Sequence, residues 1–138
     1  MPRWICPDCE REFGARNQAH VCSPGISVDE LLSRHPDWVT DIYEAVLEPL
    51  RALGPVHEDA VNVGVFLKSD RKLAEFRPRA RSVLLYVALP TPRSDHRVMR
   101  VHTSAPDRHF HAIKLTSADD VDEQVRSWLA EAYDLNTD

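Results

Sequence analysis

The stretch VNVGVFLKSDRKLAEFRPRARSVLLYVALP, residues 61–90, decides the fold. In its first part, Val61, Val63, Val65 and Leu67 alternate with other residues, which is the period of a β-strand. SDR predicts a turn, KLAEFRP a returning strand, and SVLLYVALP a strongly apolar strand. Two further alternating runs follow, HRVMRVHT and HFHAIKLT, with loops rich in Pro, Asp and Ser between them. Four or five such runs with short connections predict a mostly antiparallel sheet.

Helical patterns flank these strands on both sides. SVDE (27–30) is typical of a capped helix start, and Pro36 keeps that helix short. In residues 35–54 apolar side chains recur every three to four positions, and Pro49 is expected to bend or split the helix. Residues 117–135 predict a closing helix. Its expected buried face is Val121, Val125, Trp128, Leu129 and Ala132. The predicted fold class is α+β, a small, mostly antiparallel sheet flanked by N- and C-terminal helices that pack on one face.

A separate segment precedes this domain. WICPDCEREFGARNQAHVC (4–22) is polar, and SPGIS (23–27) has the composition of a short linker. We therefore predict a leader over residues 1–25 and an α+β domain over residues 26–138.

The leader contains every cysteine of the chain. Cys6, Cys9, His20 and Cys22 have the ligand types and approximate spacing of a zinc site, CxxC followed by HxC. A segment of about 20 residues cannot bury enough surface to fold alone, and a bound metal supplies that stability. Because protein fills all four positions, we predict one structural zinc ion per chain. The alternative is that these are redox or incidental cysteines.

Composition sets the broad class. The chain has 138 residues, the size of one domain, with hydrophobic and charged fractions of an ordinary globular protein. It has no apolar run that could span a membrane and no secretory signal, so we expect no membrane contact and a cytoplasmic location. The net charge is −5, yet residues 68–108 carry 10 Lys or Arg against 4 Asp or Glu.

This basic middle region is the candidate nucleic-acid contact surface. Guanidinium groups match phosphate geometry, and Arg77, Arg79 and Arg81 share one face if the strand continues through Pro78. The other predicted contacts are Lys68 and Lys72, with Arg71 beside them, and Arg11 and Arg16 of the leader. The alternative is a solvated strand face with internal ion pairs, since net acidity opposes non-specific nucleic-acid binding.

Catalytic signals are weak. The chain has only four glycines, no phosphate-binding loop and no nucleophile elbow, so no catalytic residue is predicted. Glu75 near Lys72 could be part of a nuclease site, with Asp59 or Asp70 as its second acid. A second metal site is an alternative role for four histidines. These are His96, His102, His109 and His111.

Several motifs together resemble one family. They are W-x-C-P-x-C-x-R-x-F, N-Q-x-H-x-C, LEPLRALGPV, KLAEFRPRARSVLLYVAL and DVDEQVRSWLAEAYDL. They resemble a bacterial family of domains of unknown function, number 5655, over residues 4–22 and 36–134. The resemblance implies a compact α+β fold and a zinc-ligand leader, and it implies no catalytic residues.

Three functions remain open at this point. The favoured one is a non-enzymatic zinc-containing binding module that contacts nucleic acid. The second is a small hydrolase or nuclease with a pocket between sheet and helices. The third is a module that binds a protein partner.

Overall fold

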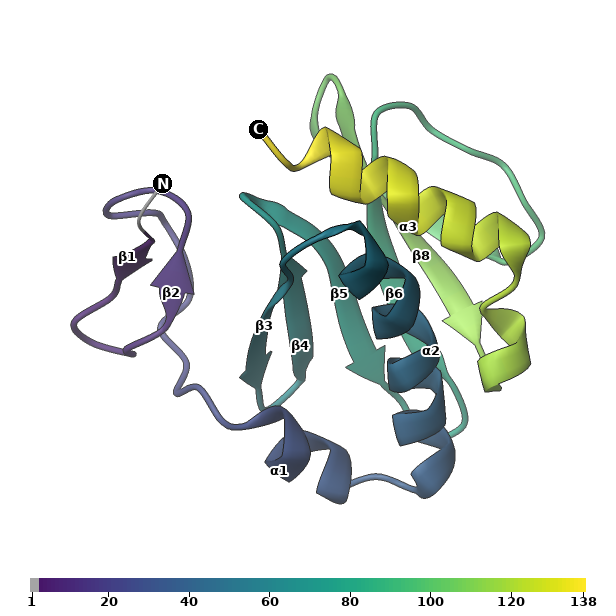
Figure 1. Ribbon diagram of the computed structural model, residues 1–138, viewed down its shortest axis with the longest axis horizontal. Helices are drawn as coiled ribbons and strands as arrows, with labels where there is room; N and C mark the ends of the chain where they lie inside the picture. Colours follow the sequence, from purple (N-terminus) through teal and green to yellow (C-terminus); the bar gives the residue numbers. More distant parts are fainter. Residues whose placement is uncertain (1–2) are drawn as a thin grey trace.

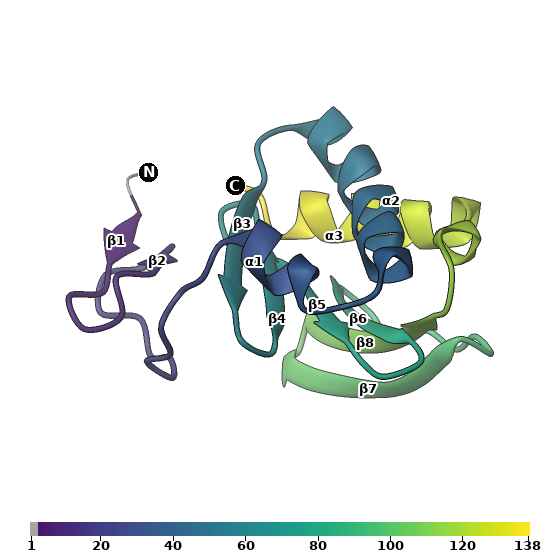
Figure 2. The same cartoon turned by 90° about the horizontal axis from the view of Figure 1, so that it is seen from below.

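The computed structural model describes residues 3–138, and its core is one six-stranded antiparallel sheet with helices on one face (Figures 1 and 2). The strand order is β3-β4-β5-β6-β8-β7, and every neighbouring pair is antiparallel. The strands are β3 (His57–Val61), β4 (Gly64–Lys68), β5 (Lys72–Pro78), β6 (Val83–Leu89), β7 (Val98–Ala105) and β8 (Arg108–Leu115). The predicted α+β class is confirmed.

Helices α1 (Val28–Ser33), α2 (Asp37–Leu53) and α3 (Glu123–Leu135) complete the domain. Ser27 caps α1 as predicted, since its hydroxyl accepts a hydrogen bond from the Glu30 N–H at 3.0 Å. Pro49 does not split α2, which runs unbroken through it. A 3₁₀ turn, η1 (Ala118–Asp120), precedes α3: Ser117 caps this turn, and Asp122 caps α3.

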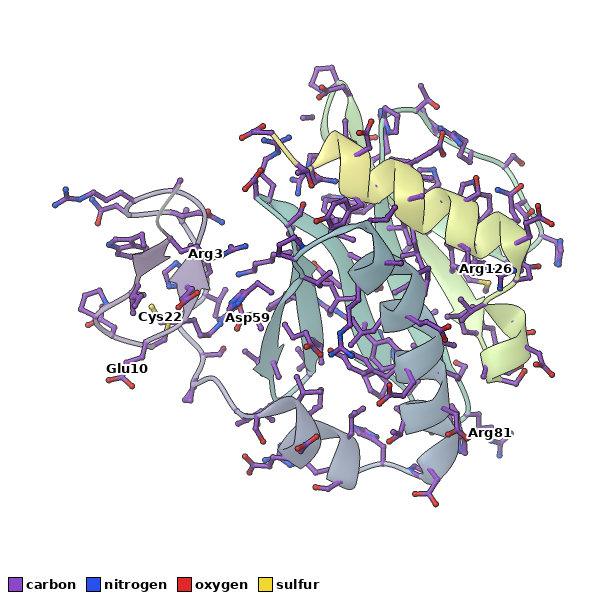
Figure 3. All side chains as sticks on the ribbon, viewed as in Figure 1. Arg3, Glu10, Cys22, Asp59, Arg81 and Arg126 are labelled. Carbon is purple, nitrogen blue, oxygen red and sulfur yellow. The ribbon has the colours of Figure 1, made fainter. Side chains whose placement is uncertain are left out.

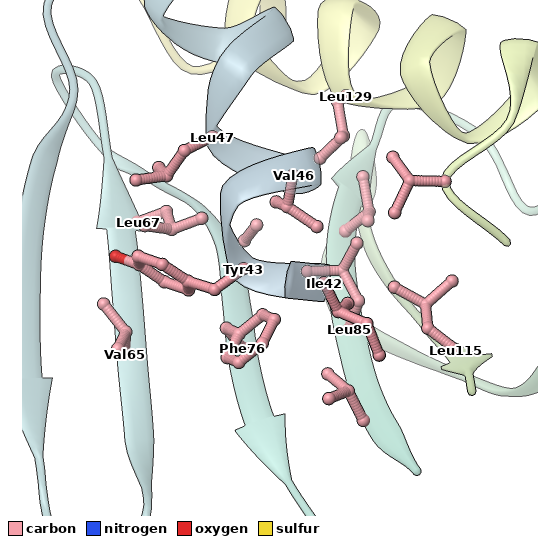
Figure 4. Close-up of a cluster of buried hydrophobic side chains, with 14 of the residues drawn as sticks. Ile42, Tyr43, Val46, Leu47, Val65, Leu67, Phe76, Leu85, Leu115 and Leu129 are labelled. Carbon is pink, nitrogen blue, oxygen red and sulfur yellow. The ribbon is translucent and has the colours of Figure 1, made fainter. Parts of the chain in front are cut away.

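The core lies between α2, α3 and one face of the sheet (Figure 4). Ile42, Val46 and Leu50 of α2 are buried as the helical period predicts, but Leu53 at its end is 49% exposed. All five predicted residues of the closing helix region are buried, among them Trp128 and Leu129. The sheet contributes Val65, Leu67, Phe76, Leu85, Ile113 and Leu115.

The segment VNVGVFLK is a hairpin rather than one strand. Val61 ends β3, Gly64 begins β4, and Asn62 and Val63 form the turn between them. Val63 is therefore 59% exposed, although it belongs to the same alternating run as the buried Val61, Val65 and Leu67. Strand β3 was missed because its residues His57, Glu58 and Asp59 are polar.

The leader forms its own small two-stranded sheet, β1 (Trp4–Ile5) and β2 (Glu12–Phe13), beside the β3 edge of the main sheet (Figure 1). One backbone bridge joins the linker to that edge: the Ile26 N–H donates to the Ala60 carbonyl at 3.0 Å. No helix in the described part of the chain is long and apolar enough to cross a membrane.

Candidate metal centre and adjoining basic cleft

The four predicted ligands converge. The ligand atoms of Cys6, Cys9, His20 and Cys22 all lie within 4.8 Å of one another. The Sγ atoms of Cys6 and Cys22 are 3.7 Å apart, and His20 Nε2 is 3.5 Å from Cys9 Sγ and 3.3 Å from Cys22 Sγ. A tetrahedral zinc with ordinary bond lengths requires edges of about 3.8 Å between sulfurs and about 3.6 Å between sulfur and nitrogen. The ligand geometry therefore fits a zinc-sized tetrahedral ion.

Local backbone structure positions the first pair of thiols. The Cys6 N–H donates to the Arg11 carbonyl, and the Cys6 carbonyl accepts from the Glu10 N–H at 2.8 Å. Glu10 adopts a left-handed conformation with φ of 60°, which turns the chain back from Cys9 into β2. The CxxC loop is therefore held by the hairpin that follows it.

The imidazole is oriented for ligation through Nε2. His20 Nδ1 lies 2.7 Å from the Gln18 carbonyl, so Nδ1 carries the proton and donates it there. The Phe13 ring stacks on the His20 ring with centroids 4.0 Å apart, and Trp4 lies 6.1 Å from Phe13. These rings form the small apolar cluster of the leader, as expected for a segment of this length.

Two of the thiols shift each other's ionisation in opposite directions. Backbone hydrogen bonds, the strongest from Cys9, lower the pKa of Cys6 to about 7. The hydrogen bond with Cys6, with burial and the neighbouring negative charge adding to it, raises the pKa of Cys22 to about 11. Without a cation, ionisation of one thiol thus disfavours ionisation of its neighbour. A bound divalent ion would offset that repulsion between thiolates.

The leader is fastened to the main sheet by a buried group of charges. Asp59 of β3 accepts from Arg11 Nε at 3.0 Å, from Arg11 Nη2 at 3.1 Å and from Lys68 Nζ at 2.9 Å. All three side chains are less than 10% exposed. Burial alone would raise the pKa of Asp59, but these hydrogen bonds outweigh it and hold that pKa below its usual value. Lys68 also donates to the Glu12 carbonyl at 3.0 Å.

Between the leader and the helix-free face of the main sheet lies a cleft of about 1090 Å³. We call it the basic cleft, because its lining residues include seven Lys or Arg and three Asp or Glu. The basic residues are Arg3, Arg11, Lys68, Arg71, Lys72, Arg77 and Arg108. The excess of positive charge contrasts with the net −5 of the whole chain.

The fold brings together only some of the predicted contact residues. Lys72 and Arg77 line the cleft, where both form ion pairs with Glu75. Arg11 and Lys68 form ion pairs with Asp59. Arg79 and Arg81 do not share a face with Arg77, since β5 ends at Pro78 and both lie exposed in the following turn. Figure 3 shows Arg81 on the far side of the main domain from Asp59, which lies between the leader and the sheet. Arg16 is exposed on the leader, outside the cleft lining.

Sequence inspection missed Arg3 and Arg108. Arg3 donates to the Ser69 carbonyl, and its Nη1 is buried without a hydrogen-bond partner among residues 3–138. Arg108 donates to the Lys72 carbonyl and, at 3.0 Å, to Asn136 Oδ1. Neither has a carboxylate partner in the described part of the chain. No local pattern could reveal them, because the fold brings both to the turn between β4 and β5 from distant positions.

The four histidines of the proposed second site are not brought together. His109 and His111 are buried, whereas His102 pairs with Phe110 across the strands and so faces the other side of the sheet. His96 lies exposed in a loop. Within residues 3–138, the Cys/His group of the leader is the one cluster of three or more potential ligands.

Comparison with known proteins finds one family. The model of the domain of unknown function DUF5655 matches residues 28–136, which span α1 to the end of α3. No curated protein and no solved structure matches the chain. The match covers more than half of the chain and begins after the Cys/His leader, and on that basis this protein belongs to the DUF5655 family.

Proposed function

We propose that this protein is a non-enzymatic binding module in which a leader built around one structural zinc ion and the main sheet together hold nucleic acid. The observation that carries the proposal is the basic cleft, with seven cationic side chains against three acidic ones. Phosphate contacts supply most of the affinity of nucleic-acid-binding proteins, and Arg and Lys provide them.

Zinc is the metal that the donor set favours. Three thiolates and one imidazole at tetrahedral spacing suit zinc, and four protein ligands leave no position for a substrate or a reactive water. The proposed role of the ion is therefore structural. A cytoplasmic location fits this role, because a reducing compartment keeps the three thiols free to ligate.

The nuclease alternative has weaker support, although Glu75 and Lys72 do lie in the cleft. A magnesium-dependent site needs carboxylates that are free to take the ion. Asp59 is held by Arg11 and Lys68, and Glu75 is held by Lys72 and Arg77. Asp59 and Glu75 are thus each already neutralised by two cations, while Asp70, which also lines the cleft, accepts a hydrogen bond from the Asp138 N–H at 2.6 Å.

Fluorescence anisotropy on zinc-loaded protein at low salt tests the proposal. The probes are labelled single-stranded DNA and RNA, duplex DNA and a structured RNA. We expect binding that weakens steeply with salt, because each neutralised phosphate releases counterions. Absence of binding to all of these probes would overturn the proposal.

A pair of matched double variants locates the contact. Arg71→Gln with Lys72→Gln removes two cleft cations, and the slope of log K against log salt should flatten by about 1.4 on a single strand. Arg34→Gln with Arg51→Gln removes the same charge from exposed positions, at the C-terminal cap of α1 and on α2, and should leave the slope unchanged. Equal effects of the two pairs would place the contact outside the cleft.

A further inference from the structure

The helix-free face of the sheet carries a line of side chains across all six strands. The register pairs Asp59 with Phe66, Phe66 with Glu75, and Glu75 with Tyr86. The line continues from Tyr86 to Ala112 of β8 and ends at Arg100 of β7. Directly paired residues point to the same side of a sheet, and five strand spacings span roughly 24 Å. The basic cleft occupies only the β3–β5 end of this line.

Cations lie over aromatic rings of β4, β6 and β8 on this face. Lys72 Nζ lies 5.3 Å from the Phe66 centroid and 4.9 Å from the Phe110 centroid, which places it between β4 and β8. The guanidinium groups of Arg77 and Arg100 lie 5.5 and 5.7 Å from the Tyr86 centroid. Arg100 also donates to the Tyr86 hydroxyl at 2.7 Å. Positive charge therefore extends beyond the cleft to the outer strand of the sheet.

The face has the wrong shape for a duplex. Reading a major groove requires an inserted helix or a two-stranded ribbon. Here α2 and α3 cover the opposite face, and the leader lies beside the β3 edge (Figure 2), where it lines one side of the basic cleft. A single strand meets neither obstacle, because its backbone can follow a groove while its bases stack on guanidinium planes or rings.

From this arrangement, and resting on the proposed function, we infer that the ligand is a single strand of DNA or RNA. It crosses the sheet from the basic cleft at β3 to Arg100 on β7. Arg77 and Arg100, each lying against Tyr86, present stacking surfaces and phosphate contacts at the outer end. A strand that spans the line has about four to six nucleotides, near the lower end of the site sizes of small sheet domains.

A length series with one variant tests the inference. Labelled oligothymidylates of three to ten nucleotides are titrated by anisotropy into zinc-loaded wild type and Arg100→Gln. Affinity should rise with length and level off once the strand spans the sheet. Arg100→Gln should weaken the long oligomers by about tenfold, the scale of one lost stacking contact, and leave the three-nucleotide oligomer unchanged. Arg126→Gln, which removes one exposed arginine on α3, is the matched control. It should change the affinity neither for the long oligomers nor for the three-nucleotide oligomer.

The outcomes separate this inference from the proposed function. Duplex binding as tight as single-strand binding overturns the inference and leaves nucleic-acid binding intact. An Arg100→Gln protein that binds long oligomers like wild type does the same. Failure of every nucleic acid to bind overturns both.

Discussion

Replacing Asp59 with Asn should release the leader from the sheet while the metal centre stays folded. Asp59 is 5% exposed, and its partners Arg11 and Lys68 are 8% and 7% exposed. Asparagine keeps the shape and one acceptor oxygen but removes the charge that balances two buried cations. Breaking a buried ion pair from one side costs about 3–5 kcal/mol.

Most of this free-energy cost should weaken the docking of the leader on the main sheet. Arg11 belongs to the leader and regains water only when the leader moves away from β3. A cost of about 3 kcal/mol raises the undocked population about a hundredfold relative to wild type. The Cys/His ligands all lie within the leader, so their geometry does not depend on the docked state.

Amide hydrogen exchange followed by NMR measures this directly. The Ile26 N–H bonds to Ala60 across the junction, whereas the Cys6 and Glu10 amides bond inside the leader. In Asp59→Asn, protection of Ile26 should fall about a hundredfold, and protection of Cys6 and Glu10 should persist with one zinc bound. Asp41→Asn, an exposed change on α2, should alter none of them. Unchanged Ile26 protection, or loss of zinc, would refute the reasoning.

Three further predictions follow from the same structure. Elemental analysis should find one zinc per chain, and Cys9→Ser should lose it while residues 26–138 still unfold cooperatively; a metal content well below one in the wild type would contradict this. Trp128→Ala should lower the free energy of unfolding by about 3–5 kcal/mol in a urea titration, and a loss under about 1 kcal/mol would mean that α3 does not dock as described. Burial lowers the pKa of His111, so the native state binds fewer protons than the unfolded chain below about pH 6.5, and stability should decline as the pH falls from there towards 5. His111→Gln should reduce that decline, and an identical pH profile would exclude His111 as a source.

The parts of the structure that depend on local rules were predictable from the sequence. The Cys/His cluster follows from spacing within 17 residues, and the buried faces of α2 and α3 follow from the helical period. Ser27 caps its helix because a hydroxyl at that position has a free N–H within reach. In each case the interacting groups lie within a few turns of chain.

The missed parts depend on partners that are distant in sequence. Strand β3 has little apolar alternation because its polar side chains are satisfied elsewhere: Glu58 accepts from Tyr43 and Arg51, and Asp59 binds Arg11 and Lys68. The turn at Asn62 and Val63 lacks the glycine that marks most tight hairpins.

The basic cleft shows the same limit. Charge counting along the chain found Lys72 and Arg77, but Arg3 and Arg108 reach the cleft only through the fold. The same charge pattern also pointed to Arg79 and Arg81, but β5 ends at Pro78 and both lie in the turn that follows. Because the cleft is lined by residues from both ends of the chain, no sequence motif marks it.

The aromatic rings on the helix-free face have a thermodynamic consequence. Tyr86 and Phe110 are only 9% and 7% exposed in the unliganded protein, because arginine and lysine side chains already lie over them. The water around these rings was released when the chain folded, so a ligand that settles on the cationic layer removes little apolar surface from water. The heat capacity of the system should therefore change little on binding, in contrast to ligands that enter an open aromatic groove. On this face the aromatic rings position the arginine and lysine side chains, and those side chains would contact the ligand.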